Sequence, residues 1–338
     1  MNQIKKLLLA TDAWRPQING VVRTWETSIH VLRERGHRVE VIEPGQFPSM
    51  PIPFYPEIRL CLPWQNQIAQ RVRLFQPDFI HIATEGPIGL AMRTFCTRRQ
   101  LRFTTSYHTK FPEYLERMVG LPSRWSYRFM RWFHSRSSAI LIATPTLEKE
   151  LITWGFRSPM RRWSRGVDLE LFHPRPKTLF DFPRPLLLYV GRVSKEKSIE
   201  DFLKIKTPGT KIIVGDGPIR PRLEKQYPEA KFLGYRKGEA LAEVYANCDL
   251  FVFPSRTDTF GLVIIEALAS GLPVAAYPVL GPIDILTGEN LGAMNNDLGV
   301  AIQEALQTGD AQKCERFGRE FTWDRCTDQL FQSFVPVC

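Results

Sequence analysis

The chain alternates between short, almost entirely apolar runs and longer segments with helical periodicity, and this alternation limits its possible folds more than any other feature. Short runs that are apolar on both faces are typical of strands buried in a parallel sheet. Strands that alternate with helices predict an α/β protein built on parallel sheets. In the first half the strand-like runs are residues 5–10, 38–42, 78–82, 102–106 and 139–143.

A stretch rich in proline and arginine, residues 173–185, interrupts this pattern and predicts a linker. The apolar runs then resume at residues 186–190, 211–214, 231–233, 249–253 and 273–276. We therefore expect two Rossmann-like domains that face each other across a cleft, the first over residues 1–172 and the second over residues 186–320. Residues 321–338 contain an apolar-faced helix that we expect to pack back towards the first domain.

Composition narrows the partners but does not choose among them. The net charge of +10 and the isoelectric point near 9.4 favour an anionic partner, such as nucleotide phosphates, an anionic membrane surface or nucleic acid. The six cysteines are scattered, without the spacing of metal ligands, which favours reduced thiols and a cytoplasmic location. We find neither an apolar run of membrane-spanning length nor a segment resembling a signal peptide.

The segment after the run at 249–253 carries two carboxylates, Asp258 and Glu266, with a turn at Gly261 between them. An apolar helix begins at this turn, so Asp258 is expected in the preceding loop and Glu266 inside the helix. The carboxyl end of a buried parallel strand is where α/β sheets usually bind ligands. The plain alternative is that Asp258 caps the helix and Glu266 forms a solvated ion pair.

The start of that helix is a predicted anion site. The backbone amides of Gly261, Leu262 and Val263 are expected to point out of the helix N-terminus, where a phosphate binds well. A loop carboxylate, a phosphate site and a helical carboxylate together suit a sugar nucleotide. One acid would bind sugar hydroxyls and the other ribose hydroxyls.

Cations follow the first strand of the second domain. Arg192 and Lys197 are expected at its carboxyl end, where they could neutralise the charge that grows on a departing diphosphate. Arginine can bind two phosphate oxygens with its planar fork, whereas lysine acts as a point charge. The alternative is a solvated basic turn.

Two further loops of the second domain are weaker signals. Gly215, Asp216 and Gly217 form a turn that could cradle a nucleotide or merely reverse the chain. Tyr235 lies in a segment, residues 232–236, whose backbone amides would lie near a nucleobase if a nucleotide binds here.

In the first domain, Asn19 and Gly20 open a helix after the first strand and form a second possible anion site. His108 follows the run at 102–106 and is expected at the rim of the cleft, although a lone histidine is as often structural. Glu85 begins another polar loop on the same rim.

The segment 122–133 has helical periodicity with separate basic and aromatic faces, as in a helix that lies in an anionic membrane interface. The alternative is a surface helix whose aromatic side chains pack on its own sheet. The basic face carries Arg124, Arg128 and Arg131, and the other carries Trp125, Phe129, Trp132 and Phe133.

Taken in this order, the motifs resemble the retaining glycosyltransferases of family 4, which have the GT-B fold. The resemblance covers nearly the full length and is similar in detail to bacterial GDP-mannose-dependent mannosyltransferases and lipid glycosyltransferases. It rests on residues 19–21, the His108 segment, residues 166–168 with Phe172, Gly191 and Arg192 with Glu196 and Lys197, residues 215–218, and residues 258–273.

The resemblance implies roles for the conspicuous residues of the second domain. Arg192 and Lys197 would bind the donor diphosphate and stabilise its departure. Glu266 would hold the ribose hydroxyls. Asp258, at a position that the family usually fills with glutamate, would bind sugar hydroxyls near the anomeric carbon.

In the first domain the resemblance implies that His108 contacts the donor sugar and that Gly20 lets the backbone approach it. The family transfers with retention, and a phosphate oxygen takes the proton of the acceptor. The resemblance therefore implies neither a metal ion nor a cofactor, in keeping with a sequence that contains no Asp-x-Asp pair.

We therefore expect transfer of a hexose, with mannose from GDP-mannose as the best guess, to a lipid or glycan acceptor on the cytoplasmic face of a membrane. One alternative is a GT-B epimerase acting on the sugar nucleotide itself. Another is a basic binding protein for nucleic acid or anionic glycans. Because the sequence contains no recognised nucleic-acid module, nucleic acid is not the expected partner.

Overall fold

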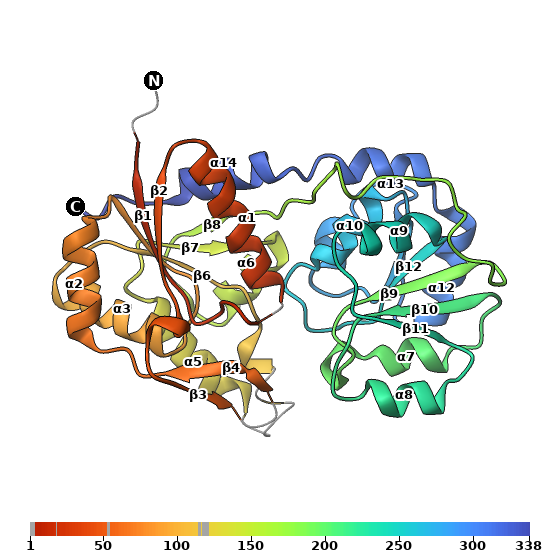
Figure 1. Cartoon of the computed structure of the whole chain (residues 1–338), viewed down its shortest axis with the longest axis horizontal. Coiled ribbons are helices and arrows are strands. Elements are labelled where there is room, and N and C mark those ends of the chain that lie inside the picture. Colours follow the sequence, from red (N-terminus) through yellow and green to blue (C-terminus); the bar gives the residue numbers. More distant parts are fainter. Residues whose placement is uncertain (1–3, 18, 53–54, 114–115, 117–121) are drawn as a thin grey trace. The chain divides into compact units, whose positions relative to one another are not determined.

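A computed structural model of the chain describes residues 4–17, 19–52, 55–113, 116 and 122–338 (Figure 1). The chain divides into two compact units, Met1–Arg165 with Trp323–Cys338, and Gly166–Thr322. We call these units the first and the second domain. Each is built on a parallel sheet with helices on its faces, so the predicted α/β class with two Rossmann-like domains is confirmed.

The first domain has a parallel sheet with strand order β2-β1-β5-β6-β7-β8. Its strands are β1 (Lys6–Ala10), β2 (Arg38–Ile42), β5 (Phe79–Ile82), β6 (Thr104–Ser106), β7 (Ala139–Ile142) and β8 (Met160–Arg162). Its helices are α1 (Gly20–Glu34), α2 (Gln65–Phe75), α3 (Pro87–Arg98), α5 (Ser123–His134), α6 (Pro145–Thr153) and α14 (Trp323–Ser333).

Alternation along β1 separates the two cores of this domain. Leu7 and Leu9 pack in one core with Trp25 of α1 and with α14, whereas Leu8 packs in the other with Met92 of α3. Both faces of the strand are therefore apolar, as expected for a central parallel strand. The last helix, α14, lies beside α1 (Figure 1), and Arg35 forms ion pairs with two of its carboxylates.

The sequence analysis did not anticipate an antiparallel hairpin, β3 (Ser49–Ile52) and β4 (Tyr55–Cys61), which follows the short helix η1 (Pro44–Gln46). Cys61 is buried in the core. Met50 and Leu60, which form the next pair along the hairpin, are exposed. The side of the hairpin that faces solvent is thus partly apolar.

The second domain has a parallel sheet with strand order β11-β10-β9-β12-β13-β14. Its strands are β9 (Leu186–Val190), β10 (Thr210–Val214), β11 (Lys231–Gly234), β12 (Leu250–Phe253), β13 (Val274–Ala276) and β14 (Gly292–Met294). Its helices are η2 (Lys195–Lys197), α7 (Ile199–Lys204), α8 (Arg220–Gln226), α9 (Glu239–Asn247), α10 (Leu262–Ala269), α11 (Pro282–Ile285), α12 (Leu298–Thr308) and α13 (Ala311–Gly318).

The segment between Gly166 and β9 belongs to the second domain and is fixed to it. Val167 forms a β-bridge with Thr322, so the chain enters and leaves this domain at neighbouring residues. Further along, Lys177 and Arg184 both form ion pairs with Asp249 at the start of β12. The proline-rich residues 173–185 are therefore anchored by charge to the amino edge of the sheet.

Both sheets contain a point where the order of strands reverses. In the second domain it lies between β9 and β12, and in the first between β1 and β5. The loops that leave neighbouring strands in opposite directions open a crevice at such a point, and open α/β sheets bind ligands there. These two places are where site residues should gather.

Candidate functional site

Lys197 and Asp258 meet at the switch point of the second domain. Lys197 lies in η2, in the connection that follows β9, and Asp258 lies in the loop after β12. Their Nζ and Oδ1 atoms are 2.5 Å apart, and both side chains are about three-quarters buried. Burial alone would raise the pKa of Asp258, but the charge of Lys197 together with the hydrogen bonds from Lys197 and Ser255 outweighs it and lowers the pKa below its usual range. The structure thus unites two predicted site residues that are far apart in the sequence.

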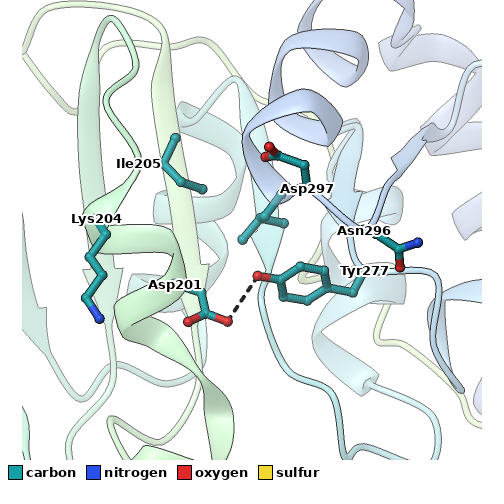
Figure 2. A pocket seen from close by; sticks show the side chains of 7 residues that line it. Asp201, Lys204, Ile205, Tyr277, Asn296 and Asp297 are labelled. Carbon is teal, nitrogen blue, oxygen red and sulfur yellow. Dashed lines mark hydrogen bonds between the residues drawn. The ribbon is translucent and has the colours of Figure 1, made fainter.

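A second set of contacts ties the Asp258 loop to its surroundings. The guanidinium of Arg256 lies 3.4 Å from the centre of the Tyr277 ring, and the Tyr277 hydroxyl donates to Asp201 of α7 at 3.0 Å. Figure 2 shows Tyr277 reaching Asp201 beside a pocket of about 360 Å³. We call Arg256, Tyr277 and Asp201 the loop anchor. The sequence did not predict the loop anchor. Its only indication was Arg256, the basic residue two positions before Asp258.

The loops after β9 and β10 cross so closely that two glycines are required. A Cβ atom on Gly215 would lie 1.9 Å from the Gly191 carbonyl oxygen, and one on Gly217 would lie 2.3 Å from that of Val193. The turn at residues 215–217 therefore holds the Arg192 loop in place. Asp216 itself is exposed and accepts from its neighbour's amide, so its side chain turns towards solvent.

The helix start at which an anion site was predicted follows the Asp258 loop in the second domain. Gly261 has a φ of +93° and forms the N-cap, so the cap residue has no side chain to bond to the first amides of the helix. Only glycine adopts this backbone conformation readily. The amides of Leu262 and Val263 therefore begin a helix whose N-cap residue is a glycine, next to the Asp258 loop.

Glu266 is buried inside α10 and is not a solvated surface acid. It is 2% exposed, and its Oε2 accepts from the hydroxyl of Tyr245 at 3.0 Å. This geometry excludes the solvated ion pair considered from the sequence. Tyr245, on α9, was not expected from the sequence and fixes the carboxylate of Glu266.

Two other predicted donor-binding residues of the second domain, Arg192 and Tyr235, are less buried than Glu266. Arg192 is half-buried, and its carbonyl oxygen accepts from the Tyr189 hydroxyl at 2.7 Å, which fixes the backbone of the loop. Tyr235 follows β11 and is 46% exposed. Arg192 and Tyr235, like Lys197, follow strands of the sheet of the second domain.

His108 differs most from the sequence interpretation. It follows β6 as expected, but its side chain is only 8% exposed and lies between Trp25 and Arg165. Trp25 Nε1 lies 3.0 Å from His108 Nε2, and Arg165 Nη2 lies 3.2 Å from Nδ1. Burial, helped by the charge of Arg165, holds the pKa of His108 well below 6.5, so the ring is neutral. The histidine is packed against the core and not displayed at a rim, because distant residues cover it.

The other predicted anion site, at Gly20, is partly occupied by its own cap. Asn19 Oδ1 accepts from the amides of Val21 and Val22, each at 3.0 Å. These are the amides that a bound anion would use, so an anion would have to displace the asparagine. Gly20 itself is exposed at the start of α1.

Helix α5 places its basic and aromatic residues on one exposed face, whereas the sequence analysis separated them. Tyr127, Met130 and Phe133 form its buried face. The difference arises because a helix of this length buries only a narrow stripe against the sheet. The exposed side chains are Arg124, Trp125, Arg128, Phe129, Arg131 and Trp132.

Within the described part of the chain, none of the helices combines the length and the apolar character needed to cross a bilayer.

Comparison with known proteins gives the same picture for both domains. Residues 18–171 match the model of the family described as Glycosyltransferase Family 4, and residues 184–308 match that of Glycosyl transferases group 1. The solved structure of sucrose-phosphate synthase from Thermosynechococcus elongatus superimposes with a TM-score of 0.76 at 21% identity, covering 97% of this chain and 98% of that one.

Curated relatives extend over most of the chain. A sulfoquinovosyl transferase of Arabidopsis thaliana is 30% identical over 93% of this chain, which spans 66% of that relative's length. A GDP-mannose-dependent alpha-mannosyltransferase of Mycolicibacterium smegmatis is 30% identical over 83% of this chain and 82% of its own length. An alpha-monoglucosyldiacylglycerol synthase of Streptococcus pneumoniae is 25% identical over 88% of this chain and 77% of its own length.

Proposed function

This chain belongs to glycosyltransferase family 4 and has the GT-B fold, and from that premise we propose that it transfers mannose from GDP-mannose, with retention, to a lipid or glycan acceptor at the cytoplasmic face of a membrane. The observation that carries the proposal is the pairing of Lys197 with Asp258 at the switch point of the second domain. In the proposal the cation binds the diphosphate and the carboxylate beside it binds sugar hydroxyls.

In this proposal the donor changes the partners of both residues. The diphosphate, with its two negative charges, competes with Asp258 for Lys197. Asp258 is then released to accept hydrogen bonds from the hydroxyls of the sugar. Arg192 joins Lys197 on the diphosphate and stabilises the charge that grows as the bond to the sugar breaks.

The remaining parts of the second domain suit the nucleoside and the phosphates. The amides of Leu262 and Val263, at a helix start capped by a glycine, would bind a phosphate oxygen. Glu266, held by Tyr245, has a second carboxylate oxygen that would accept from ribose hydroxyls. Departure of the diphosphate supplies the oxygen that takes the acceptor's proton, as the family resemblance implies.

His108 enters this proposal through its packing. Because Trp25 and Arg165 hold a neutral ring, His108 would contact the donor sugar only at its small exposed edge. Gly20, at the exposed start of α1, would let the backbone approach the same sugar.

A membrane-associated acceptor is supported by α5 and by the relatives. The exposed face of α5 presents three arginines and three aromatic side chains, a combination that binds anionic interfaces. One of the relatives is named as a synthase of glucosyldiacylglycerol.

The test is a thermal-shift panel with GDP, UDP, ADP and their common sugar conjugates, followed by product analysis. A ligand at about 100 times its dissociation constant stabilises the folded state by about 2.7 kcal/mol. We expect the largest shift with GDP-mannose. A selective shift with uridine nucleotides would replace mannose by another hexose.

Two outcomes would favour the alternatives. A shift with a nucleic-acid duplex and with none of the nucleotides would favour the basic binding protein. Conversion of the sugar nucleotide into an isomer, without transfer to any acceptor, would favour the epimerase.

A further inference from the structure

A pocket of about 700 Å³ lies at the end of α5 in the first domain and has no role in the donor site described above. Arg131, in the last turn of α5, and Arg157, in the loop between α6 and β8, both line it. Ser137 and Pro159, also in its lining, come just before β7 and β8, so the pocket lies at the amino edge of the sheet. Open α/β sheets bind substrates at the opposite, carboxyl edge. We call this cavity the α5 pocket.

The hydroxyl groups around the α5 pocket are already used to cap α5. Ser137 Oγ and Ser158 Oγ donate to the carbonyl oxygen of His134 at 2.7 and 2.9 Å. Ser135 Oγ donates to the carbonyl oxygen of Trp132 at 2.7 Å. The last carbonyl groups of a helix carry a partial negative charge and need donors. Because these hydroxyls supply them, the end of α5 opposes a bound anion less than a bare helix end would.

The side chain of His134 also lines the α5 pocket, but both of its ring nitrogens have partners elsewhere. Nδ1 lies 2.8 Å from the Thr105 hydroxyl, and Nε2 lies 3.2 Å from Oε1 of Glu85. The His134 side chain is only 1% exposed. No acidic residue is among the described residues that line the pocket. The charge of its walls is therefore set by the two arginines.

The two guanidinium groups keep donors for a ligand. Arg131 donates one hydrogen bond, from Nη1 to the Trp154 carbonyl oxygen at 3.3 Å. Gly155, with a φ of +81°, lets the loop pass close to it, since a Cβ atom there would lie 3.1 Å from the same nitrogen. Arg157 is exposed, and its side chain has neither a hydrogen bond nor an ion pair among the residues that the structure describes. Guanidinium groups bind phosphate oxygens in pairs, so a phosphate is the ligand that these walls suit.

The surroundings of the α5 pocket favour a phosphate that belongs to a lipid. Arg131 contributes both to the pocket and to the exposed face of α5, so the two are continuous. On that face Trp132 is 50% exposed and Phe129 is 36% exposed. Aromatic side chains of amphipathic helices lie at the boundary between headgroups and acyl chains, next to the lipid phosphates. A phosphate in solution would have no use for these aromatic neighbours.

We propose that the α5 pocket binds the phosphate of an anionic lipid headgroup through Arg131 and Arg157, and so orients the first domain on the membrane. The inference rests on the membrane contact in the proposed function and adds a specific headgroup site to it. The lipid held here is not the sugar acceptor, because the pocket lies at the edge of the sheet opposite to the one that binds substrates.

The main test compares Arg157→Gln with Arg136→Gln in sedimentation with phosphatidylglycerol vesicles. Arg136 is exposed just after α5 and does not line the pocket, so both variants lose one charge from the same region. A charge that is merely near an anionic surface accounts for about a fivefold change in affinity, which is the most we expect for Arg136→Gln. Because Arg157 would bind the phosphate directly, its loss should weaken vesicle binding about twentyfold or more.

Arg157→Lys separates a headgroup site from simple attraction, since it keeps the charge and loses the planar fork. We expect it to bind the vesicles about fivefold more weakly than the unmodified protein. Simple attraction to the surface would leave its binding unchanged, and that result would contradict the proposed site. Because Arg157 is exposed, both of its variants should fold, which circular dichroism checks.

Titration calorimetry with glycerol 3-phosphate and inorganic phosphate tests a soluble source of the phosphate. We expect neither to bind with a dissociation constant below about 1 mM, since both lack the membrane contacts of α5. Tighter binding that is lost in Arg157→Gln, with vesicle binding unchanged in that variant, would assign the pocket to a soluble phosphate and overturn the lipid.

The remaining outcomes separate the pocket from the proposed function. Equal losses of vesicle binding in Arg157→Gln and Arg136→Gln would overturn the headgroup site and leave the membrane contact standing. If the unmodified protein does not bind phosphatidylglycerol vesicles, the membrane location in the proposed function fails, and the headgroup site fails with it.

Discussion

At the scale of single residues, the candidate site depends on the balance between burial and charge at Asp258. Burial disfavours the charged form of the Asp258 carboxylate, whereas the nearby ammonium of Lys197 favours it. Because both side chains are largely buried, removing one of them would leave the other charge buried without compensation. The pair therefore sets the charge state of the site and also contributes to stability.

We predict that Lys197→Ala loses at least a hundredfold in transfer rate while the protein still folds, with some loss in its free energy of unfolding. Without Lys197 the pKa of Asp258 rises, because burial is no longer offset. The stability loss should therefore be largest at neutral pH and shrink towards pH 4, where Asp258 is protonated in the variant. Urea denaturation at both pH values measures this, and full transfer by a folded variant would remove the assigned role.

Asp12 gives a prediction of opposite sign. Burial raises its pKa from 3.8 to about 6, even though the hydrogen bonds from Ile88, Thr84 and Gly89 act against the shift. Between these values the folded state holds a proton that the unfolded state has lost, so stability falls as the pH rises. The effect is up to about 3 kcal/mol and is complete above pH 6.

The measurement compares denaturation of the unmodified protein and Asp12→Asn between pH 4 and 7. The variant should lack this part of the slope. Buried neutral histidines such as His81, with a pKa lowered by burial to about 3, act in the opposite direction, because stability is lost as the pH falls below 6.5. They are the same in both proteins and cancel in the difference, so equal slopes would contradict the assignment.

At the scale of elements, α5 is held firmly while its outer face stays free for contact. The buried Arg93 of α3 donates to the carbonyl oxygens of Phe133 and Trp132, and its guanidinium lies 4.0 Å from the centre of the Trp132 ring. Trp132 is thus fixed in place and still 50% exposed. A rigid, exposed tryptophan beside arginines suits a membrane interface.

We predict that replacing Arg124, Arg128 and Arg131 together by alanine weakens binding to phosphatidylglycerol vesicles at least tenfold in a sedimentation assay. Each basic residue near an anionic surface contributes about 1 kcal/mol. The matched control replaces three exposed arginines of the second domain, Arg236, Arg316 and Arg319. Equal loss in both triple variants would leave α5 without a specific role.

The loop anchor gives a second prediction at the scale of elements. Tyr277→Phe removes the hydrogen bond to Asp201 but keeps the ring under Arg256. We expect a stability loss of about 0.5–1.5 kcal/mol and a rise in the donor KM, because the Asp258 loop loses one attachment. The donor KM of Tyr227→Phe, a change on the same domain away from the loop, should stay constant.

The strands with the clearest signal in the sequence are those whose burial is nearly complete. Leu186–Val190 and Leu250–Phe253 are continuous apolar runs because both faces of a central parallel strand are covered. Met160–Arg162 and Gly292–Met294 lie at sheet edges and need not be apolar, so their sequences give no such signal.

The same limit applies to site residues. The local spacing of Asp258 and Glu266 predicts a loop and a helix, but nothing local indicates that Lys197 or Tyr245 will meet them. His108 looked accessible because Trp25 and Arg165, which bury it, are distant in the sequence. Sequence patterns report on neighbours along the chain, whereas partners across the sheet come from topology.

At the scale of the whole molecule, the net positive charge of the chain comes from the first domain. The first domain has 26 lysines and arginines against 14 aspartates and glutamates, a net charge of +12. The second has 19 against 21, a net charge of −2. The excess therefore lies in the domain that contains α5 and not in the domain that contains Lys197 and Asp258.

We predict that vesicle binding by the full chain falls more than tenfold when the ionic strength rises from about 0.05 to 0.5 M, because screening shortens the reach of exposed charges. Vesicles of neutral phosphatidylcholine should bind weakly at both salt concentrations. Strong binding to neutral vesicles would mean that the aromatic residues act without the charge.

The β-bridge between Val167 and Thr322 has a consequence for how such a protein can be rearranged. Because the chain enters and leaves the second domain side by side, the whole of Gly166–Thr322 is an insertion between Arg165 and Trp323. Because its two ends are adjacent, this domain could be removed as one piece and replaced by the corresponding domain of a relative. Natural recombination could exchange the second domain in the same way while the first domain stays unchanged.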